Sequence, residues 1–385
     1  MVFDAAIIGG GPAGSAIGRL LASWGYRVRI VAAPVDRARG LAESLPPSTR
    51  KLLAEVGVLD AVDAAGFLRG SGNTAYWAST EPRIEMFDAP GYQIFRPDFD
   101  ALLLECARAA GADVRSAVVR RVDLDADVAT VEYDERGERT AVSCRFVIDC
   151  SGRAGIVGRR FRRMDDRVFG FVGVWRSDRG WDLADQTHTI VETFDDGWAW
   201  SVPVRWAEAP GVGIDATTRH VGVMVGETGA PYDAIIARTS AIKRLVDGAS
   251  LERTFACDAS TYSSSVYAGP RFLLVGDAGS FIDPLSSFGV KKALASAWLG
   301  AIAVHTSLVD PDREDVALGF FGDREREMQT AHGARAFART AYERHPTRFW
   351  ERHRDAMEPP SAPRDDAAVA VAFERFRASA SIDLR

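Results

Sequence analysis

A glycine-rich turn near the N-terminus, GGGPAG at residues 9–14, constrains the fold of this chain more than any other stretch. It follows an apolar run at residues 3–8 that is typical of a buried parallel strand, and a helical pattern and a second apolar strand come after it. This order is the context in which G-x-G-x-x-G binds a dinucleotide. We expect Gly9 to make the tight turn, Gly11 to let backbone N–H groups approach a pyrophosphate, and Gly14 to let helix and strand pack closely. An ordinary glycine-rich turn is the alternative, and the motif alone does not separate FAD from NAD.

The end of the second strand bears on that choice. Many dinucleotide folds place an acid there to hold a ribose 2′-OH, whereas this chain has Ala32, with Asp36 slightly later. The adenosine end must then be held by Asp36 or by backbone groups, which weakens a plain NAD interpretation.

Bulk properties narrow the class of protein. The chain has 385 residues, too many for one simple core, so two domains that can interleave are expected. A formal net charge of -6 gives no reason to expect nucleic-acid binding. No apolar run reaches about 18 residues, so we expect no membrane span, and residues 293–304 read as a helix packed inside the protein. The N-terminus lacks a basic leader, and the four cysteines are widely spaced, so we expect free thiols and a cytoplasmic location.

Two polar positions follow the nucleotide motif. Glu43 and Ser44 stand before a proline turn, where they could reach a flavin or its ribityl chain; an ordinary polar loop is the alternative. Arg96 stands at the start of an amphipathic helix and could also reach a cofactor, the alternative being a surface arginine.

Two further strand ends carry small residues and an acid. Asp149 to Gly152 follows one apolar strand, and Gly276-Asp277 follows another, with a helix starting near Gly289. Asp277 could accept hydrogen bonds from ribityl hydroxyls. The N–H groups of residues 288–290 could face negative charge that develops on a reduced isoalloxazine.

Residues from about 166 to 262 change character, because short strands recur there and predict a second, largely antiparallel sheet. Trp198 and Trp200 alternate along one strand and so share one face with Val202. Two such tryptophans are either core or the wall of an aromatic substrate pocket. His332, His345 and His353 show no metal-ligand spacing, so we expect surface or helix-capping histidines and no metal site.

The motifs together resemble a known superfamily. The spacing of Gly9-x-Gly11-x-x-Gly14, Asp149 to Gly152 and Gly276-Asp277 is similar to that of flavoprotein monooxygenases of the para-hydroxybenzoate-hydroxylase fold, over nearly the whole chain. Within it, the chain resembles the branch that contains the flavin-dependent halogenases. That likeness is carried by Glu43-Ser44-x-Pro46, Trp198-x-Trp200-x-Val202-Pro203 and Gly276-Asp277-Ala278 through Asp283-Pro284.

One departure separates the chain from the halogenases. They carry an essential lysine in a glycine-flanked K-x-G, and its expected counterpart here is Arg69. An arginine stays protonated and differs in shape, so we do not expect halogenation. The run over residues 281–294 is instead similar to non-halogenating members, among them flavoproteins that hydroxylate a tryptophan of a partner protein during tryptophylquinone maturation.

The resemblance implies an α/β fold in which a Rossmann-like FAD-binding domain interleaves with a mainly antiparallel substrate domain. The expected divisions are 1–73, 96–165 and 264–310 for FAD binding, 74–95 and 166–263 for the substrate, and a helical region over 311–385. It also implies FAD as the cofactor, held by Gly9, Gly11, Pro12, Ala13, Gly14, Glu43, Ser44, Arg96, Asp149, Gly152, Gly276, Asp277, Pro284, Gly289 and Val290. The residues implied at the reacting centre are Trp198, Trp200, Phe288 and Gly289.

The implied activity is hydroxylation of an electron-rich aromatic substrate, an indole or a peptidyl tryptophan, by a flavin C4a-hydroperoxide. No nucleophile of the Ser-His-Asp kind is needed, and none is seen. A flavin-dependent halogenase, a prenyl reductase of the geranylgeranyl type and a non-catalytic flavin-binding maturation factor are the alternatives. The chain has no second complete nucleotide motif, so a separate flavin reductase is the expected source of reduced FAD.

Overall fold

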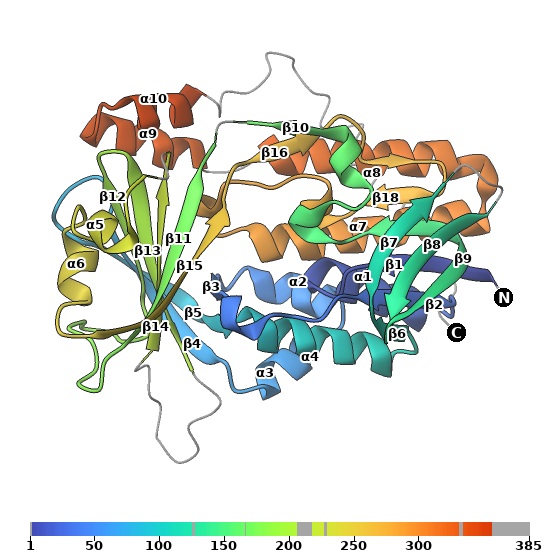
Figure 1. The fold of residues 1–385 in the computed structure, drawn as a ribbon, viewed down its shortest axis with the longest axis horizontal. Helices are drawn as coiled ribbons and strands as arrows, with labels where there is room; N and C mark the ends of the chain where they lie inside the picture. Colours follow the sequence, from blue (N-terminus) through green and yellow to red (C-terminus); the bar gives the residue numbers. More distant parts are fainter. Residues whose placement is uncertain are drawn as a thin grey trace.

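The computed structural model describes residues 2–124, 128–165, 167–205, 218–226, 229–330 and 334–355, and it contains two large sheets with helices around them (Figure 1). The expected fold class is confirmed, since a Rossmann-like sheet, a second and mainly antiparallel sheet and a helical C-terminal segment are all present. The part of the expected helical region beyond residue 355 lies outside the described residues, as does His332.

The first sheet has the order β17-β18-β9-β1-β2-β6, and the contacts from β18 to β6 are all parallel. Strands β7 and β8 extend β9 as an antiparallel ribbon. The bounds are β1 Val2–Ile8, β2 Val28–Ala32, β6 Asp113–Ser116, β7 Val118–Asp123, β8 Ala129–Glu135, β9 Glu138–Asp149, β17 Ala268–Gly269 and β18 Phe272–Leu274. Helices α1 (Pro12–Ser23), α4 (Arg96–Ala109) and α7 (Gly289–Val309) pack on one face of this sheet and share a single hydrophobic core with it.

Local sequence explains the limits of α1. Pro12 occupies its first turn, where a missing backbone N–H costs nothing, and its φ suits a helix start. Gly25 follows the helix with a φ of 89°, a conformation that glycine adopts without strain and that commonly ends a helix. The strand–turn–helix unit is therefore specified by short-range signals.

The second sheet has the order β15-β11-β14-β13-β12-β4-β5-β3. Its bounds are β3 Ala42–Leu45, β4 Leu68–Tyr76, β5 Arg83–Phe95, β11 Phe169–Arg176, β12 Thr189–Phe194, β13 Gly197–Val204, β14 Thr218–Val225 and β15 Ser250–Asp258. Strand β3 and the first half of β4 had been expected in the FAD-binding domain, but both form hydrogen bonds in this sheet. The sequence did not reveal this because β3 is short and reads as a loop before prolines.

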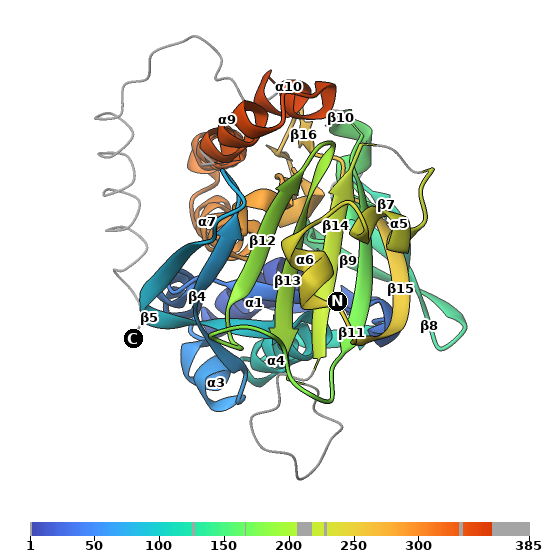
Figure 2. The ribbon, with the colours of Figure 1, turned by 90° about the vertical axis from the view of Figure 1, so that its left-hand side faces the viewer.

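Helices cover the second sheet on two sides, as Figure 2 shows. The short helices α5 (Tyr232–Ile236) and α6 (Ala241–Leu245) pack on one face, which we call the outer face. The inner face carries Trp198 and Trp200, and helices α9 (Ala334–Arg344) and α10 (Arg348–Asp355) close its upper end. The remaining elements are α2 Thr49–Glu55, α3 Leu59–Ala64, α8 Glu314–Thr330, the two-stranded sheet of β10 Arg162–Met164 and β16 Tyr262–Ser264, and the 3-10 helices η1 Arg37–Arg39, η2 Gly152–Ala154, η3 Gly158–Phe161, η4 Gly276–Ala278, η5 Pro284–Ser286 and η6 Pro311–Arg313.

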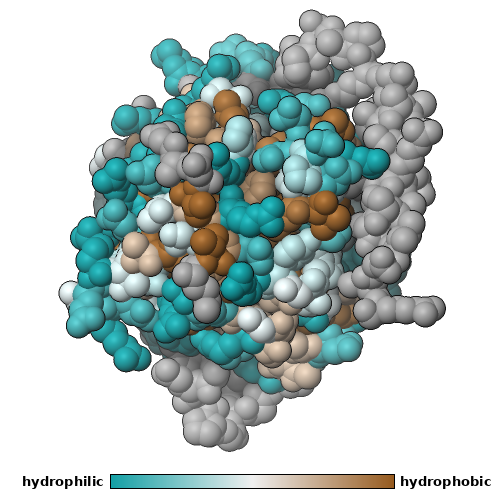
Figure 3. Space-filling model, turned by 90° about the vertical axis from the view of Figure 1, so that its right-hand side faces the viewer, coloured by the Kyte–Doolittle hydropathy of each residue, from teal (hydrophilic) through white to brown (hydrophobic). Residues whose placement is uncertain are grey.

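Helix α7 is the one described helix long and apolar enough to cross a membrane, judged by length and composition. Most of it is buried inside the protein, where it packs against α1 and α8. On the face of the molecule at the right of Figure 1, apolar side chains lie in small groups among hydrophilic ones (Figure 3). Helix α7 is therefore a core helix, as the sequence predicts.

Candidate cofactor and substrate site

Three sequence motifs meet where the parallel strands end. A Cβ added to Gly9 would lie 2.3 Å from the carbonyl oxygen of Cys150, so the first glycine packs directly on the turn after β9. A Cβ added to Gly276 would lie 3.1 Å from the Cβ of Ala13, so the turn after β18 packs on the start of α1. Gly9 and Gly276 also have positive φ angles of 108° and 65°, which favour glycine. The predicted tight turn at Gly9 is confirmed.

Two helix N-termini at this place carry no capping side chain. Helix α1 starts from Gly11 and helix α7 from Phe288, and neither has a side-chain cap or an acidic residue in its first turn. A Cβ added to Gly11 would meet no atom closer than Asp100 Oδ2 at 3.8 Å, and one added to Gly289 would meet nothing within 4 Å. Free N–H groups, positive helix ends and open space above a glycine are what a pyrophosphate and an electron-accepting ring require. The residues present therefore fit a bound FAD.

An ion cluster lies beside the glycine turn. Arg96 donates to Glu43 Oε1 at 2.7 Å and, through Nε and Nη2, to both carboxylate oxygens of Asp100 at 3.0 and 3.1 Å. Burial raises the pKa of Asp100, and Arg96 opposes this rise. Burial acts to lower the pKa of Arg96, but Asp100 and Glu43 together raise it above its ordinary value. Arg96 and Glu43 are thus held together near Gly11. Asp100 was not singled out, although its position four residues after Arg96 on a helix is the signal that could have found it.

Asp149 forms hydrogen bonds within its own loop. One carboxylate oxygen accepts from the N–H and hydroxyl of Ser151, at 3.0 and 2.6 Å. The other accepts from the N–H groups of Val157 and Gly158, at 2.6 and 2.9 Å. With four hydrogen bonds from its own loop, Asp149 shapes the turn that contains Gly152. Gly152 has a φ of 63° and open space at its Cβ position, so it can approach a ligand closely.

The Gly276–Ser280 turn is fixed from behind by α7. The buried Lys292 donates from Nζ to the carbonyl oxygens of Gly276 at 3.0 Å and Ser280 at 2.5 Å. Ser296 accepts from the N–H of Gly276 at 2.9 Å. Burial raises the pKa of Asp277, and Lys292 opposes the rise. Lys292 is a site residue that the sequence analysis did not single out, because the pair Lys291-Lys292 reads as ordinary helix surface.

The loop from Asp283 to Phe288, with Pro284 at the start of η5, leads into α7. Asp283 accepts from the N–H of Leu285 at 2.9 Å, and its other oxygen lies 2.9 Å from Nε2 of His353 in α10. Both side chains are buried. The expectation of a surface or helix-capping role for His353 is therefore wrong. His353 is buried because its ring stacks on Phe349 with a 4.6 Å centroid separation.

The inner face of the second sheet carries the two tryptophans on β13, as the alternation predicts. Trp198 is 3% and Trp200 9% exposed, and both pack in a cluster with Val202, Trp350 and Leu285. The ring of Trp200 covers Gly222, where an added Cβ would lie 2.3 Å from it. The tryptophans thus belong to a core that also reaches the loop before α7. Their place at a reacting centre stays a prediction.

Two remaining sequence positions have other partners. Asp36 accepts from the N–H of Ala38 at 3.0 Å and so caps η1. Arg69 lies on β4 with its side chain 41% exposed, 2.8 Å from Asp63 and stacked over Tyr92 at 4.3 Å. Arg69 is therefore part of a surface ion cluster.

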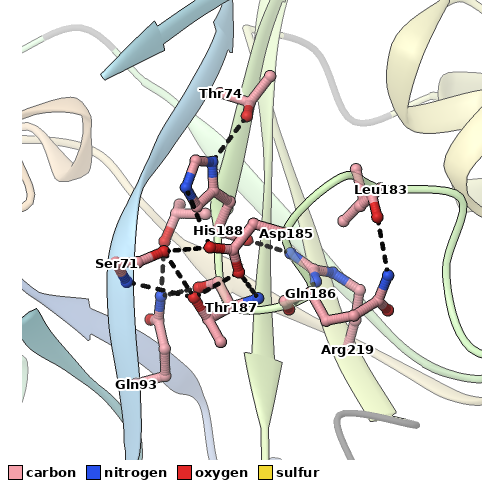
Figure 4. Close-up of polar contacts among 10 residues, drawn as sticks. Ser71, Thr74, Gln93, Leu183, Asp185, Gln186, Thr187, His188 and Arg219 are labelled. Carbon is pink, nitrogen blue, oxygen red and sulfur yellow. Dashed lines mark hydrogen bonds and ion pairs between the residues drawn. The ribbon is translucent and has the colours of Figure 1, made fainter. Parts of the chain in front are cut away.

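A polar cluster joins β4 to the segment before β12 (Figure 4). Ser71 Oγ donates to Asp185 Oδ2 at 2.5 Å, whereas Nδ1 of His188 lies 3.0 Å from the hydroxyl of Thr74. The serine bonds the carboxylate and not the imidazole, so these three residues are not arranged as a Ser-His-Asp relay. The fully buried Arg219 donates to the carbonyl oxygens of Gln186 and His188 and so holds this segment in place (Figure 4). Burial lowers the pKa of Arg219 to about 9.

The family model described as an FAD binding domain matches residues 2–298. The chain belongs to this FAD-binding family. It is a flavin-dependent oxidoreductase with FAD as its cofactor, as predicted.

Among curated relatives, the chain is 29% identical to a tryptophan 2-halogenase from Chondromyces crocatus, over 77% of this chain. It spans only 60% of that protein's length. It is 27% identical to a putative FAD-dependent oxidoreductase, LodB, from Marinomonas mediterranea, and this match covers 91% of the chain and 96% of LodB.

Solved structures show the same fold. The flavin-dependent halogenase CmlS superposes with a TM-score of 0.82 and 28% identity, over 99% of this chain and 72% of CmlS. The peptidyl tryptophan dihydroxylase QhpG superposes with a TM-score of 0.75 and 22% identity, over 92% of this chain and 79% of QhpG.

Proposed function

We propose that this protein is an FAD-dependent monooxygenase that hydroxylates an electron-rich aromatic ring, an indole or the tryptophan side chain of a peptide. The observation that carries the proposal is the position of the lysines, because the halogenases carry an essential lysine where this chain has Arg69. The sequence has four of them, and none lies on a strand of the second sheet. Lys51 and Lys243 are exposed on α2 and α6, and the buried Lys292 is bound to two carbonyl oxygens.

The fourth lysine, Lys291, lies in the first turn of α7. Its Nζ donates to Ser48 Oγ at 3.1 Å and lies 4.6 Å from the ring centroid of Phe288. Lys291 is therefore bound to the loop before α2 and does not lie on β4, the strand that carries Arg69. Arg69 cannot replace a lysine either, because its side chain is bound to Asp63.

The residues have distinct tasks in this proposal. Bound FAD, once reduced, supplies the electrons that activate O2. Gly11, Ala13 and Gly14 present backbone N–H groups to the pyrophosphate, and Asp277 accepts from ribityl hydroxyls. The α7 N-terminus at Gly289 stabilises negative charge on the ring system. The apolar cluster around Trp198 and Trp200 limits access of water to the aromatic substrate.

Halogenation is the second candidate, and the similarity to CmlS and to the tryptophan 2-halogenase favours it. A prenyl reductase and a non-catalytic maturation factor are less well supported by the relatives. We also propose that a separate flavin reductase supplies the reduced FAD. We infer it from the absence of a second complete nucleotide motif in the sequence.

The test is incubation with chemically reduced FAD, O2 and tryptophan, indole or a tryptophan-containing peptide, with chloride or bromide present. We expect a product heavier by one oxygen atom and unchanged by the halide. A halogenated product would establish the halogenase instead. Reduction of a prenyl double bond without oxygen uptake would identify a reductase, and bound FAD without turnover on any substrate would support a maturation factor.

A further inference from the structure

We propose that His353 is a positioning residue for the loop over residues 283–288, through which helix α10 fixes the start of α7 and the aromatic inner face relative to each other. The inference rests on the proposed placement of the flavin ring at the α7 N-terminus. It assigns the C-terminal helices a part in the reaction that no sequence motif indicates.

The contact itself is a buried, charge-assisted hydrogen bond. Nε2 of His353 lies 2.9 Å from Asp283 Oδ2, and the two side chains are only 10% and 7% exposed. The other oxygen of Asp283 accepts from the N–H of Leu285, so the carboxylate has partners on both sides. A hydrogen bond to a charged group in such surroundings is stronger than one at the surface.

The loop has little freedom apart from this anchor. The backbone carbonyl of Asp283 accepts from the hydroxyl of Ser286 at 2.8 Å, and Ser286 Oγ in turn accepts from the N–H of Phe288 at 3.3 Å. Ser287 has a φ of 51°, a left-handed conformation that costs free energy in a residue with a side chain. A strained residue persists only where its surroundings hold it, and Asp283 lies four residues before Ser287 in the loop.

The same loop contacts both halves of the proposed site. At one end Phe288 is the N-cap of α7, and at the other Leu285 packs in the cluster of Trp198, Trp200 and Trp350. A shift of the loop would therefore move the α7 N-terminus and the aromatic cluster together.

Helix α10 is a firm support because it is bound to the second sheet. Nε1 of Trp350 donates to the carbonyl oxygen of Phe194 at 2.9 Å, and Trp350 is fully buried. The α9 residue Arg344 donates to the carbonyl oxygen of Tyr76 at 2.7 Å. His353 therefore links the loop over residues 283–288 to the second sheet through α10, in addition to the direct connection of this loop to α7.

The experiment compares three variants that keep the volume of the pair. H353F retains stacking on Phe349 but removes the hydrogen bond. H353Q supplies an N–H close to the position of Nε2. D283N removes the negative charge of Asp283. If H353F does not fold, D283N still tests whether the contact between His353 and Asp283 holds the loop. Each is prepared with FAD bound, and backbone amide exchange of residues 283–290 is measured by mass spectrometry together with the melting temperature.

We expect amide exchange over residues 283–290 to accelerate about tenfold in H353F and D283N, and H353Q to restore most of the protection. The melting temperature should fall modestly in H353F, because the Asp283 carboxylate loses a buried partner, whereas FAD affinity should change little. On reaction with O2, the two electrons and two protons of reduced FAD should appear more often as H2O2, at least twofold, at the expense of aromatic product. Unchanged exchange and an unchanged share of H2O2 in H353F would overturn the inference.

Failure of the proposed function gives a different pattern. If no aromatic substrate is oxygenated, the product assay is silent, but amide exchange in the FAD-bound protein still decides whether His353 holds the loop. If exchange rises uniformly along the chain and not mainly over residues 283–290, His353 is only a stabilising residue and the inference is wrong.

Discussion

Gly276 packs against Ala13, although the two residues stand near opposite ends of the segment that makes the first sheet. Their closeness places the turn after β18 on the start of α1, with a Cβ at Gly276 reaching within 3.1 Å of Ala13 Cβ. Because Gly276 also has a φ of 65°, it is constrained twice, by space and by backbone conformation.

Replacing Gly276 by alanine should therefore weaken FAD binding. The left-handed conformation costs about 1–2 kcal/mol for a residue with a side chain, and the added methyl group displaces the N-terminus of α1. We expect roughly a tenfold higher Kd for FAD in a flavin fluorescence titration. Gly319→Ala on α8 is the control, since no atom lies within 4 Å of its Cβ position. Equal FAD affinity in G276A and wild type would contradict the assigned contact.

Arg96 should matter for stability more than a typical surface arginine. Replacing it by methionine leaves Glu43 and Asp100 close together without their shared cation, which we expect to cost about 2 kcal/mol. Urea unfolding measures the loss. Arg37→Met provides the comparison, because its pair with Asp98 is 54% and 33% exposed and should be worth less than about 0.5 kcal/mol. Similar losses of unfolding free energy in both variants would show that the Arg96 cluster contributes no more to stability than a surface ion pair.

The buried His220 should make the protein less stable in acid. Burial lowers its pKa from 6.5 to about 3, and Nδ1 accepts from the N–H of Ala42 at 3.2 Å. The unfolded chain therefore binds a proton between pH 6.5 and pH 3 that the folded protein does not, so stability falls as pH decreases through this window. From pH 7 to pH 5 this group should remove about 2 kcal/mol. The difference in unfolding free energy between wild type and His220→Asn, followed against pH, isolates the effect; a flat difference would show that His220 is not buried and neutral.

Glu325 should give the free energy of unfolding the opposite dependence on pH. It is fully buried on α8, and burial raises its pKa from 4.5 to about 7 although Lys292 opposes the rise. The folded protein keeps a proton that the unfolded chain has lost above pH 4.5, so stability falls as pH rises towards 7. Relative to its stability at pH 4, the protein should lose about 3 kcal/mol from this group by pH 8. Glu325→Gln should remove that loss in the same urea titrations. If the unfolding free energies of wild type and Glu325→Gln change equally as the pH rises to 8, ionisation of the Glu325 carboxyl does not destabilise the folded protein, and the prediction is wrong.

The sequence predicted the parts of the fold that short-range signals determine. The turn at Gly9, the helix after it and the alternation of Trp198 and Trp200 each follow from a few adjacent residues. Strand β3 could not be predicted, because a four-residue strand next to Pro46 has no periodicity and is defined by its partner β5. The same limit applies to the domain boundary near residue 73.

The site residues divide in the same way. Gly276 and Arg96 could be found because each stands at the end of a recognisable strand or the start of a helix. Lys292 and His353 could not be found from the sequence, since their importance comes from burial and from partners in other elements. Asp149 was found for its position after a strand, but only the structure shows that its carboxylate is occupied by its own loop.

The central claim is that an oxygen atom from O2 is transferred to an aromatic ring. The most direct measurement is the mass of the product formed from reduced FAD, an indole or a tryptophan-containing peptide, and isotopically labelled O2 in unlabelled water with chloride present. We expect one labelled oxygen atom in the product and no chlorine. Incorporation of chlorine, or of oxygen from water alone, would contradict it.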